Sequence, residues 1–211
     1  MKFGMHRLTV FYGMTLVVAL STTASPLGWA QSHMPARPSA AEWMSQPGPE
    51  ALELARWTGI WSVVSTLRVT PDASPIVSAG LVAERRMIGP YLQEIMRPAP
   101  GSETPDFSRI SYLTYFRVEG RWQYVSLDTR FPVGIMPAVS FGKQTIGKLT
   151  LEFAPLSFVG AGDQVEGRTV LSNYVITGGN EEHQMAQQYW TRADGNGESW
   201  LAVQYEYSRK R

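Results

Sequence analysis

The sequence contains no cysteine and very little histidine. Without cysteine, the 211-residue chain can form neither disulfides nor thiolate metal sites, and it cannot be anchored through a lipidated cysteine. Its three histidines are His6, His33 and His183, and only the last belongs to the part that we expect to fold. Zinc sites built from several imidazoles are therefore disfavoured. A single histidine can hold a haem iron, but His183 follows a Gly-Gly-Asn turn, so we interpret it as an exposed strand-end residue and expect no cofactor.

Long apolar runs are also missing, apart from one near the start. Lys2 and Arg7 precede an uncharged, mostly apolar stretch from Leu8 to Leu20, and small residues then lead to Gly28-Trp29-Ala30. Thirteen residues are too few to cross about 30 Å of hydrocarbon, whereas the pattern is typical of a cleavable signal peptide. We predict a signal peptide over residues 1–30, a mature chain in the periplasm or secreted, and no stable membrane insertion after cleavage.

An excess of charge of either sign is absent as well. Charged residues make up 18% of the chain, and residues 1–30 contain two basic and no acidic side chains, so 17 basic and 18 acidic side chains remain after cleavage. Such a balance disfavours nucleic acid and acidic membrane surfaces as partners. The oligomeric state is left open by the sequence.

The first part of the mature chain reads as a linker followed by a helix. Residues 31–48 are rich in proline, alanine and serine, which is typical of a flexible linker. Residues 49–55 fit a short helix that begins with proline and has an acidic residue in its first turn. We expect Leu52 and Ala55 to lie against one end of the domain that spans residues 49–211.

A two-residue period then dominates the sequence. It places Trp61, Val63 and Leu67 on one face of a strand, with polar residues mostly on the other. Glu119-Gly120 separates two alternating runs in the manner of a two-residue hairpin turn. About ten strand-like runs result, at residues 61–70, 76–88, 91–96, 109–118, 121–130, 134–141, 148–153, 168–176, 183–192 and 199–207.

This pattern predicts an all-β fold with one short N-terminal helix. Sequential strands joined by short turns leave exposed edges unless the sheet closes on itself. We therefore expect a closed, lipocalin-like, up-and-down antiparallel barrel of about 8–10 strands, with a β-sandwich as the alternative. Trp61 is expected to pack across one end of the barrel, with a cation such as Arg209 over its indole ring.

Four segments resemble an uncharacterised bacterial family, filed as a domain of unknown function, whose members have a predicted lipocalin-like barrel. The resemblance implies the fold and no established substrate or catalytic residue. Where members often carry a glutamate, this chain has Gln204, so no carboxylate role transfers to that position. The segments are Pro47-Gly48-Pro49-Glu50, Trp57-Thr58-Gly59-Ile60-Trp61, Arg86-Met87-Ile88-Gly89-Pro90-Tyr91-Leu92-Gln93-Glu94 and Tyr205-Glu206-Tyr207-Ser208-Arg209-Lys210.

A row of alternating polar residues is the main candidate for a ligand site. Tyr124, Ser126, Asp128 and Arg130 would place two hydroxyls, a carboxylate and a guanidinium on one wall of the barrel. A shift of one residue would turn the same row to solvent, so both orientations remain open. Trp122, on the same row, favours the inward one.

Charged residues also flank the Gly89-Pro90 turn. Glu84, Arg86 and Glu94 would form either a buried pair at a pocket mouth or an ion pair on the surface, which is the more common outcome. We include Glu94 among the candidate ligand-binding residues.

Three functions fit these features. The first is the binding of a small apolar or amphipathic molecule in the barrel. The second is an isomerase- or cyclase-type enzyme with Asp128 or Glu94 as acid or base and Arg130 as an anion clamp. The third is an interaction scaffold. No Gly-x-Ser-x-Gly motif is present, and a nucleophilic triad would depend on the one histidine of the folded part.

Overall fold

The computed structural model describes residues 37–130, 134–142, 144–145, 147–159, 167–178, 181–194 and 197–211. One compact unit, Pro38–Arg211, contains all of the helices and strands that these residues form. The predicted signal peptide and the first part of the predicted linker lie outside the described residues. Within them, no helix combines the length and apolar character needed to cross a membrane.

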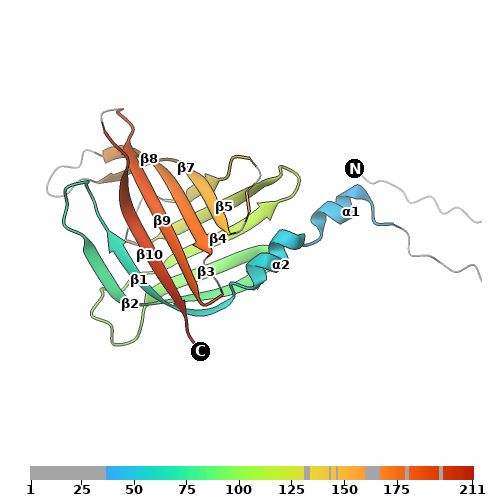
Figure 1. Ribbon diagram of the computed structural model, residues 1–211, viewed down its shortest axis with the longest axis horizontal. Coiled ribbons are helices and arrows are strands. Elements are labelled where there is room, and N and C mark those ends of the chain that lie inside the picture. Colours follow the sequence, from blue (N-terminus) through green and yellow to red (C-terminus); the bar gives the residue numbers. More distant parts are fainter. Residues whose placement is uncertain are drawn as a thin grey trace, which may run out of the picture. The chain divides into compact units, whose positions relative to one another are not determined.

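Ten antiparallel strands form a closed barrel in which each strand pairs with the next and the last pairs with the first (Figure 1). Closure satisfies the backbone groups that an open sheet would expose at its two edges. The predicted up-and-down barrel is confirmed, and the sandwich alternative is wrong. The strands are β1 (Gly59–Leu67), β2 (Ile76–Ile88), β3 (Tyr91–Pro98), β4 (Arg109–Phe116), β5 (Arg121–Asp128), β6 (Met136–Val139), β7 (Lys148–Val159), β8 (Gly167–Gly178), β9 (His183–Arg192) and β10 (Trp200–Arg209).

Helix α2 (Pro49–Ala55) covers one end of this barrel, where it contacts β2, β3 and β4. Its bounds match the prediction, but its buried residues do not. Ala51 and Leu54 are buried, whereas Leu52 is 69% exposed and Ala55 is exposed. Because neighbouring helical residues point about 100° apart, a spacing of three residues identifies a helix without showing which of its faces is buried.

Trp61 fills the barrel beside this helix, as predicted. Its side chain is fully buried, and its indole Nε1 donates a hydrogen bond to the Trp57 carbonyl at 3.0 Å. The guanidinium of Arg209 lies 4.6 Å from the centre of the indole ring. A cation over a tryptophan face is a favourable arrangement, so both residues help to close this end of the barrel.

A second helix lies where we expected a linker. Helix α1 (Ala40–Ser45) begins at a capping box, in which the Ser39 hydroxyl accepts from the Glu42 backbone N–H and the Glu42 carboxylate accepts from the Ser39 backbone N–H. Such reciprocal bonds satisfy two otherwise free N–H groups of a first turn. The alanine and serine that suggested a linker also suit a capped helix.

The β4–β5 hairpin is correct in pairing but not in turn length. Phe116 pairs with Arg121, so four residues, 117–120, form the turn in place of Glu119-Gly120 alone. The Gly120 N–H donates to the Phe116 carbonyl at 2.8 Å, and Gly120 has a φ of +67°. This is the left-handed conformation that glycine adopts most easily, and it completes a four-residue turn.

Candidate functional site

The predicted polar row of β5 points into the barrel. Trp122, Tyr124, Ser126 and Asp128 are buried, and the residues between them are partly or fully exposed. Arg130 follows the strand and remains partly exposed. The structure therefore resolves the register in favour of the inward orientation, while ligand binding by these residues stays a prediction.

Asp128 and Arg130 form a pair with one another. The Arg130 Nε and Nη2 donate to the two Asp128 oxygens at 3.0 and 2.7 Å, and the Arg130 backbone N–H donates to Oδ1 at 3.0 Å. Burial works against the charged form of Arg130, but its hydrogen bonds to Asp128 raise its pKa. The Asp128 carboxylate is thus neutralised by a bidentate partner.

Glu94 belongs to a buried ion pair, and the surface interpretation is wrong for this residue. Its Oε2 accepts from Arg85 Nε at 2.7 Å, and both side chains are more than 90% buried. Glu84 is exposed instead and lies 3.8 Å from Arg97. The Gly89-Pro90 turn explains the difference, because it pairs Ile88 with Tyr91 and thereby places Arg85 opposite Glu94 on the inner face.

Arg109 is the central residue that sequence reasoning missed. Its Nη2 donates to the Tyr124 hydroxyl at 2.5 Å and to the Tyr174 hydroxyl at 3.4 Å. Its Nη1 and Nε reach Glu94 and Ser126, each at 3.4 Å. Burial opposes the charged form, but the surrounding tyrosine oxygens raise the pKa of Arg109, so the guanidinium stays charged inside the barrel.

Buried tyrosines surround the two arginines. The Arg85 guanidinium lies 4.2 Å from the centre of the Tyr207 ring, and Arg109 lies 4.6 Å from that of Tyr205. Burial raises the pKa of Tyr174 well above its ordinary value and also raises that of Tyr207. Both phenols therefore keep their protons at neutral pH and can still donate hydrogen bonds.

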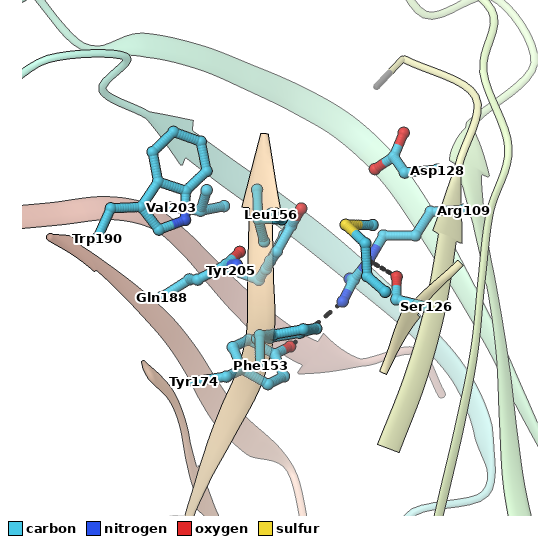
Figure 2. Close-up of a pocket in the computed structure, with 11 residues that line it drawn as sticks. Arg109, Ser126, Asp128, Phe153, Leu156, Tyr174, Gln188, Trp190, Val203 and Tyr205 are labelled. Carbon is cyan, nitrogen blue, oxygen red and sulfur yellow. Dashed lines mark hydrogen bonds between the residues drawn. The ribbon is translucent and has the colours of Figure 1, made fainter. Parts of the chain in front are cut away.

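A cavity lies beside Arg109, in the part of the barrel far from α2. It holds about 40 Å³, enough for about three waters, within about 530 Å³ of unfilled space that continues to solvent. Figure 2 shows Trp190, Val203 and Gln188 on one side of this cavity and Arg109, Ser126 and Asp128 on the other. We call it the outer cavity; its lining is Arg109, Ser126, Asp128, Met136, Phe153, Leu156, Tyr174, Gln188, Trp190, Val203 and Tyr205.

A second, inner cavity lies toward α2, within about 390 Å³ of unfilled space. Arg85, Glu94, Tyr124 and Gln184 are among its lining residues, and Tyr174 borders both cavities. The Gln184 Oε1 accepts from Arg85 at 2.5 Å, whereas its buried Nε2 makes no hydrogen bond to a described residue. A cluster of charged and phenolic side chains thus separates the two cavities.

A third hollow holds about 190 Å³ within about 660 Å³ of unfilled space, and lies outside the barrel among α1, α2 and the β4–β5 turn. Arg117 joins these parts, since its guanidinium donates to the Trp43 carbonyl at 2.6 Å and lies 3.8 Å from the centre of the Trp43 ring. This hollow shares no lining residue with the outer cavity.

Metal ligands do not cluster in the described part of the chain, where no three His, Asp or Glu side chains are placed to share an ion. His183 is exposed at the start of β9, and its Nδ1 lies 3.3 Å from the Ser208 hydroxyl. This position agrees with the interpretation of His183 as a strand-end residue.

Comparison with known proteins supports the fold and leaves the function open. No family model matches the chain, and no curated protein matches it. Among solved structures, it is similar to the crystal structure of Rv2717c from M. tuberculosis, with 18% identity, a TM-score of 0.50, and coverage of 78% of this chain and 99% of that chain. At this identity the likeness shows the barrel fold alone.

Proposed function

We propose that this protein binds a small amphipathic molecule in the outer cavity of its barrel. One observation carries the proposal, namely that a single cavity is lined by both apolar side chains and hydrogen-bonding polar ones. Phe153, Leu156 and Val203 supply apolar wall, while Arg109 and Ser126 supply hydrogen-bond donors. Ligand sites in proteins commonly combine a mainly apolar lining with a few convergent polar groups.

The size of the cavity limits the size of the ligand, and the charge pairs beside it favour binding over catalysis. The enclosed volume of about 40 Å³ is too small for a whole ring, so a ligand with one ring or a short chain would extend into the unfilled space of about 530 Å³ that continues to solvent. Both candidate acid–base groups are held by guanidinium groups, Asp128 by Arg130 and Glu94 by Arg85. A general base must be able to accept a proton from its substrate, so this arrangement favours binding over acid–base catalysis.

A pair of matched variants tests the site. Val203→Phe fills the outer cavity, because Val203 lines it and is 7% exposed, whereas Val64→Phe adds the same volume at a residue that is 40% exposed on β1. We expect indole and hexan-1-ol to bind the wild type and Val64→Phe in calorimetric titration, and to lose affinity for Val203→Phe. Absence of binding to the wild type, or equal affinity in all three proteins, would refute a ligand site here.

Export is the second part of the proposal, and residues 1–30 carry it. We infer that the barrel acts in the periplasm or outside the cell. Mass spectrometry of the protein from its native host is expected to show a chain that starts at Gln31. A full-length chain retained in the cytoplasm would refute export while leaving the cavity proposal intact.

A further inference from the structure

The barrel interior contains more positive than negative charge once Arg130 at its edge is counted. Among the described residues, the buried charged side chains are Arg85, Glu94, Arg109 and Asp128, and the partly exposed Arg130 brings the total to three cations and two carboxylates. Asp128 is neutralised by Arg130, and Glu94 lies 0.7 Å closer to Arg85 than to Arg109, at 2.7 against 3.4 Å. Arg109 is therefore the cation that lacks a carboxylate of its own.

Hydrogen bonding around Arg109 is also incomplete. Three of its four hydrogen bonds, to Glu94, Ser126 and Tyr174, are 3.4 Å long. Bonds between a charged nitrogen and oxygen are usually about 2.7–2.9 Å. A buried guanidinium with one short bond and three long ones is poorly compensated for its loss of water. Its environment therefore favours an additional acceptor.

Donors converge where such an acceptor would lie. Arg109, Ser126 and Tyr174 all line the outer cavity. The Tyr174 phenol keeps its proton, so its O–H is able to donate, as is the hydroxyl of Ser126. Figure 2 shows Arg109 reaching toward Tyr174 from the opposite side of the cavity. A planar guanidinium with hydroxyls beside it matches the oxygens of a carboxylate.

We propose that the outer cavity selects an organic monoanion of the carboxylate class, with its charged group on Arg109 and its apolar part against Phe153, Leu156 and Trp190. This inference rests on the proposed binding function and adds the charge of the ligand. One further negative charge would balance the three arginines of this region, Arg85, Arg109 and Arg130, against its two carboxylates. Asp128, on the same cavity wall, does not oppose this anion because Arg130 neutralises it.

Phenylacetate and phenylacetamide provide the test, because they have the same shape and differ in charge. We expect the wild type to bind phenylacetate about 10- to 100-fold more tightly in calorimetric titration, the range expected for a hydrogen bond to a charged group. In ¹⁵N NMR spectra, the Arg109 Nε–H resonance should shift with the acid and much less with the amide. Equal affinity of the two probes would overturn the inference.

Variants at Arg109 complete the experiment. Arg109→Met should reduce the preference for the acid to about onefold, and Arg109→Lys, which keeps the charge but not the planar fork, should retain part of it. Arg97→Met, at a side chain that is 60% exposed and outside both cavities, should leave the preference unchanged. A preference that survives Arg109→Met would overturn the inference, and the wild-type ratio decides the question if that variant does not fold.

The two proposals fail in different ways. If indole and hexan-1-ol bind but phenylacetate has no advantage over its amide, the cavity is a site for neutral ligands and only the anion inference is wrong. If none of the four probes binds, both proposals are wrong.

Discussion

At the scale of single residues, the molecule is distinguished by a charged cluster inside a β-barrel. Arg85, Glu94 and Arg109 are each buried, and their partners are mainly phenols and one another. A buried ion pair adds little net stability compared with an apolar core, but the removal of one partner is costly. Folding stability alone therefore does not explain the cluster, which is consistent with the proposed ligand site.

Glu94→Gln tests the cost of breaking this cluster. The change leaves Arg85 and Arg109 buried without a carboxylate, so we expect the free energy of unfolding to fall by about 3 kcal/mol. Glu84→Gln removes the same charge from an exposed pair on the neighbouring strand and should cost less than about 1 kcal/mol. Urea titration of both variants measures the difference, and similar losses would show that the Glu94 pair is not buried in solution.

The buried phenols predict a loss of stability at alkaline pH. Burial raises the pKa of Tyr174 and Tyr207 in the folded state. Above about pH 10 the unfolded chain releases these protons while the folded chain keeps them, so unfolding becomes easier. The free energy of unfolding should fall by about 1.4 kcal/mol per pH unit for each phenol, and should not change through them at lower pH.

Urea titrations from about pH 9 upward measure this slope. Tyr174→Phe should make it shallower, whereas Tyr91→Phe, at a side chain that is 46% exposed, should not. An identical slope in the wild type and Tyr174→Phe would contradict burial of the Tyr174 hydroxyl.

At the scale of secondary structure, α2 acts through one face only. Leu54 is fully buried against the barrel end, and Leu52 on the same helix is 69% exposed. Leu54→Ala should lower the free energy of unfolding by about 3 kcal/mol, because it leaves a cavity. Leu52→Ala should change it by less than about 0.5 kcal/mol. Denaturant unfolding of the pair checks this, and equal effects would show that α2 does not pack as a plug.

The hairpins account for much of what sequence reasoning found and missed. A two-residue turn at Gly89-Pro90 pairs Ile88 with Tyr91, and counting back along both strands places Arg85 opposite Glu94. The sequence therefore contained this pairing. We considered Arg86, which points to the other face. Similarly, the β4–β5 register places Arg109 opposite Asp128. In both hairpins, the strand register decides which residues face inward, so a known register identifies Arg85 and Arg109 as the inward arginines.

At the scale of the whole molecule, closure of the barrel depends on contacts of the last strand with the first strand and with the exit of α2. The Arg209 guanidinium donates to the carbonyls of Thr58 at 2.6 Å and Glu181 at 2.7 Å, and also to that of Arg56. The bonds to Thr58 and Arg56 connect the last strand to the exit of α2 across about 150 residues, and the bond to Glu181 reaches the segment before β9. The β1–β10 pairing, for example Val63 opposite Tyr207, completes the barrel at the same seam.

Arg209→Met should therefore weaken the whole barrel. We expect the free energy of unfolding to fall by about 2 kcal/mol, as for the loss of hydrogen bonds from a charged donor, with a single cooperative transition retained. Arg211→Met is the control, because the Arg211 side chain is 90% exposed, and it should change stability by less than about 0.5 kcal/mol. Chemical unfolding followed by tryptophan fluorescence measures both variants. An unchanged free energy of unfolding for Arg209→Met would show that the bonds of Arg209 do not stabilise the barrel.

The sequence by itself determined the local features. Alternation predicted about ten strands, and the pattern over residues 49–55 predicted α2. The row from Tyr124 to Asp128 was identified as one face of a strand, but whether it faces inward was left open. Such features depend on residues close together in the chain, whose period and turn chemistry are visible directly. The helix α1 was missed because its capping box lies in a segment with the composition of a linker.

Only the tertiary structure decided the site. Tyr174 and Tyr205 come from β8 and β10, 65 and 96 positions after Arg109, and the sequence contains no local signal that brings them together. Their meeting depends on the closed strand order and on the register of every intervening strand, in which a shift of one residue would reverse the face of each side chain. The strand pattern thus follows from short-range chemistry, whereas the grouping of Arg109, Tyr174 and Tyr205 around the outer cavity exists only because the barrel closes.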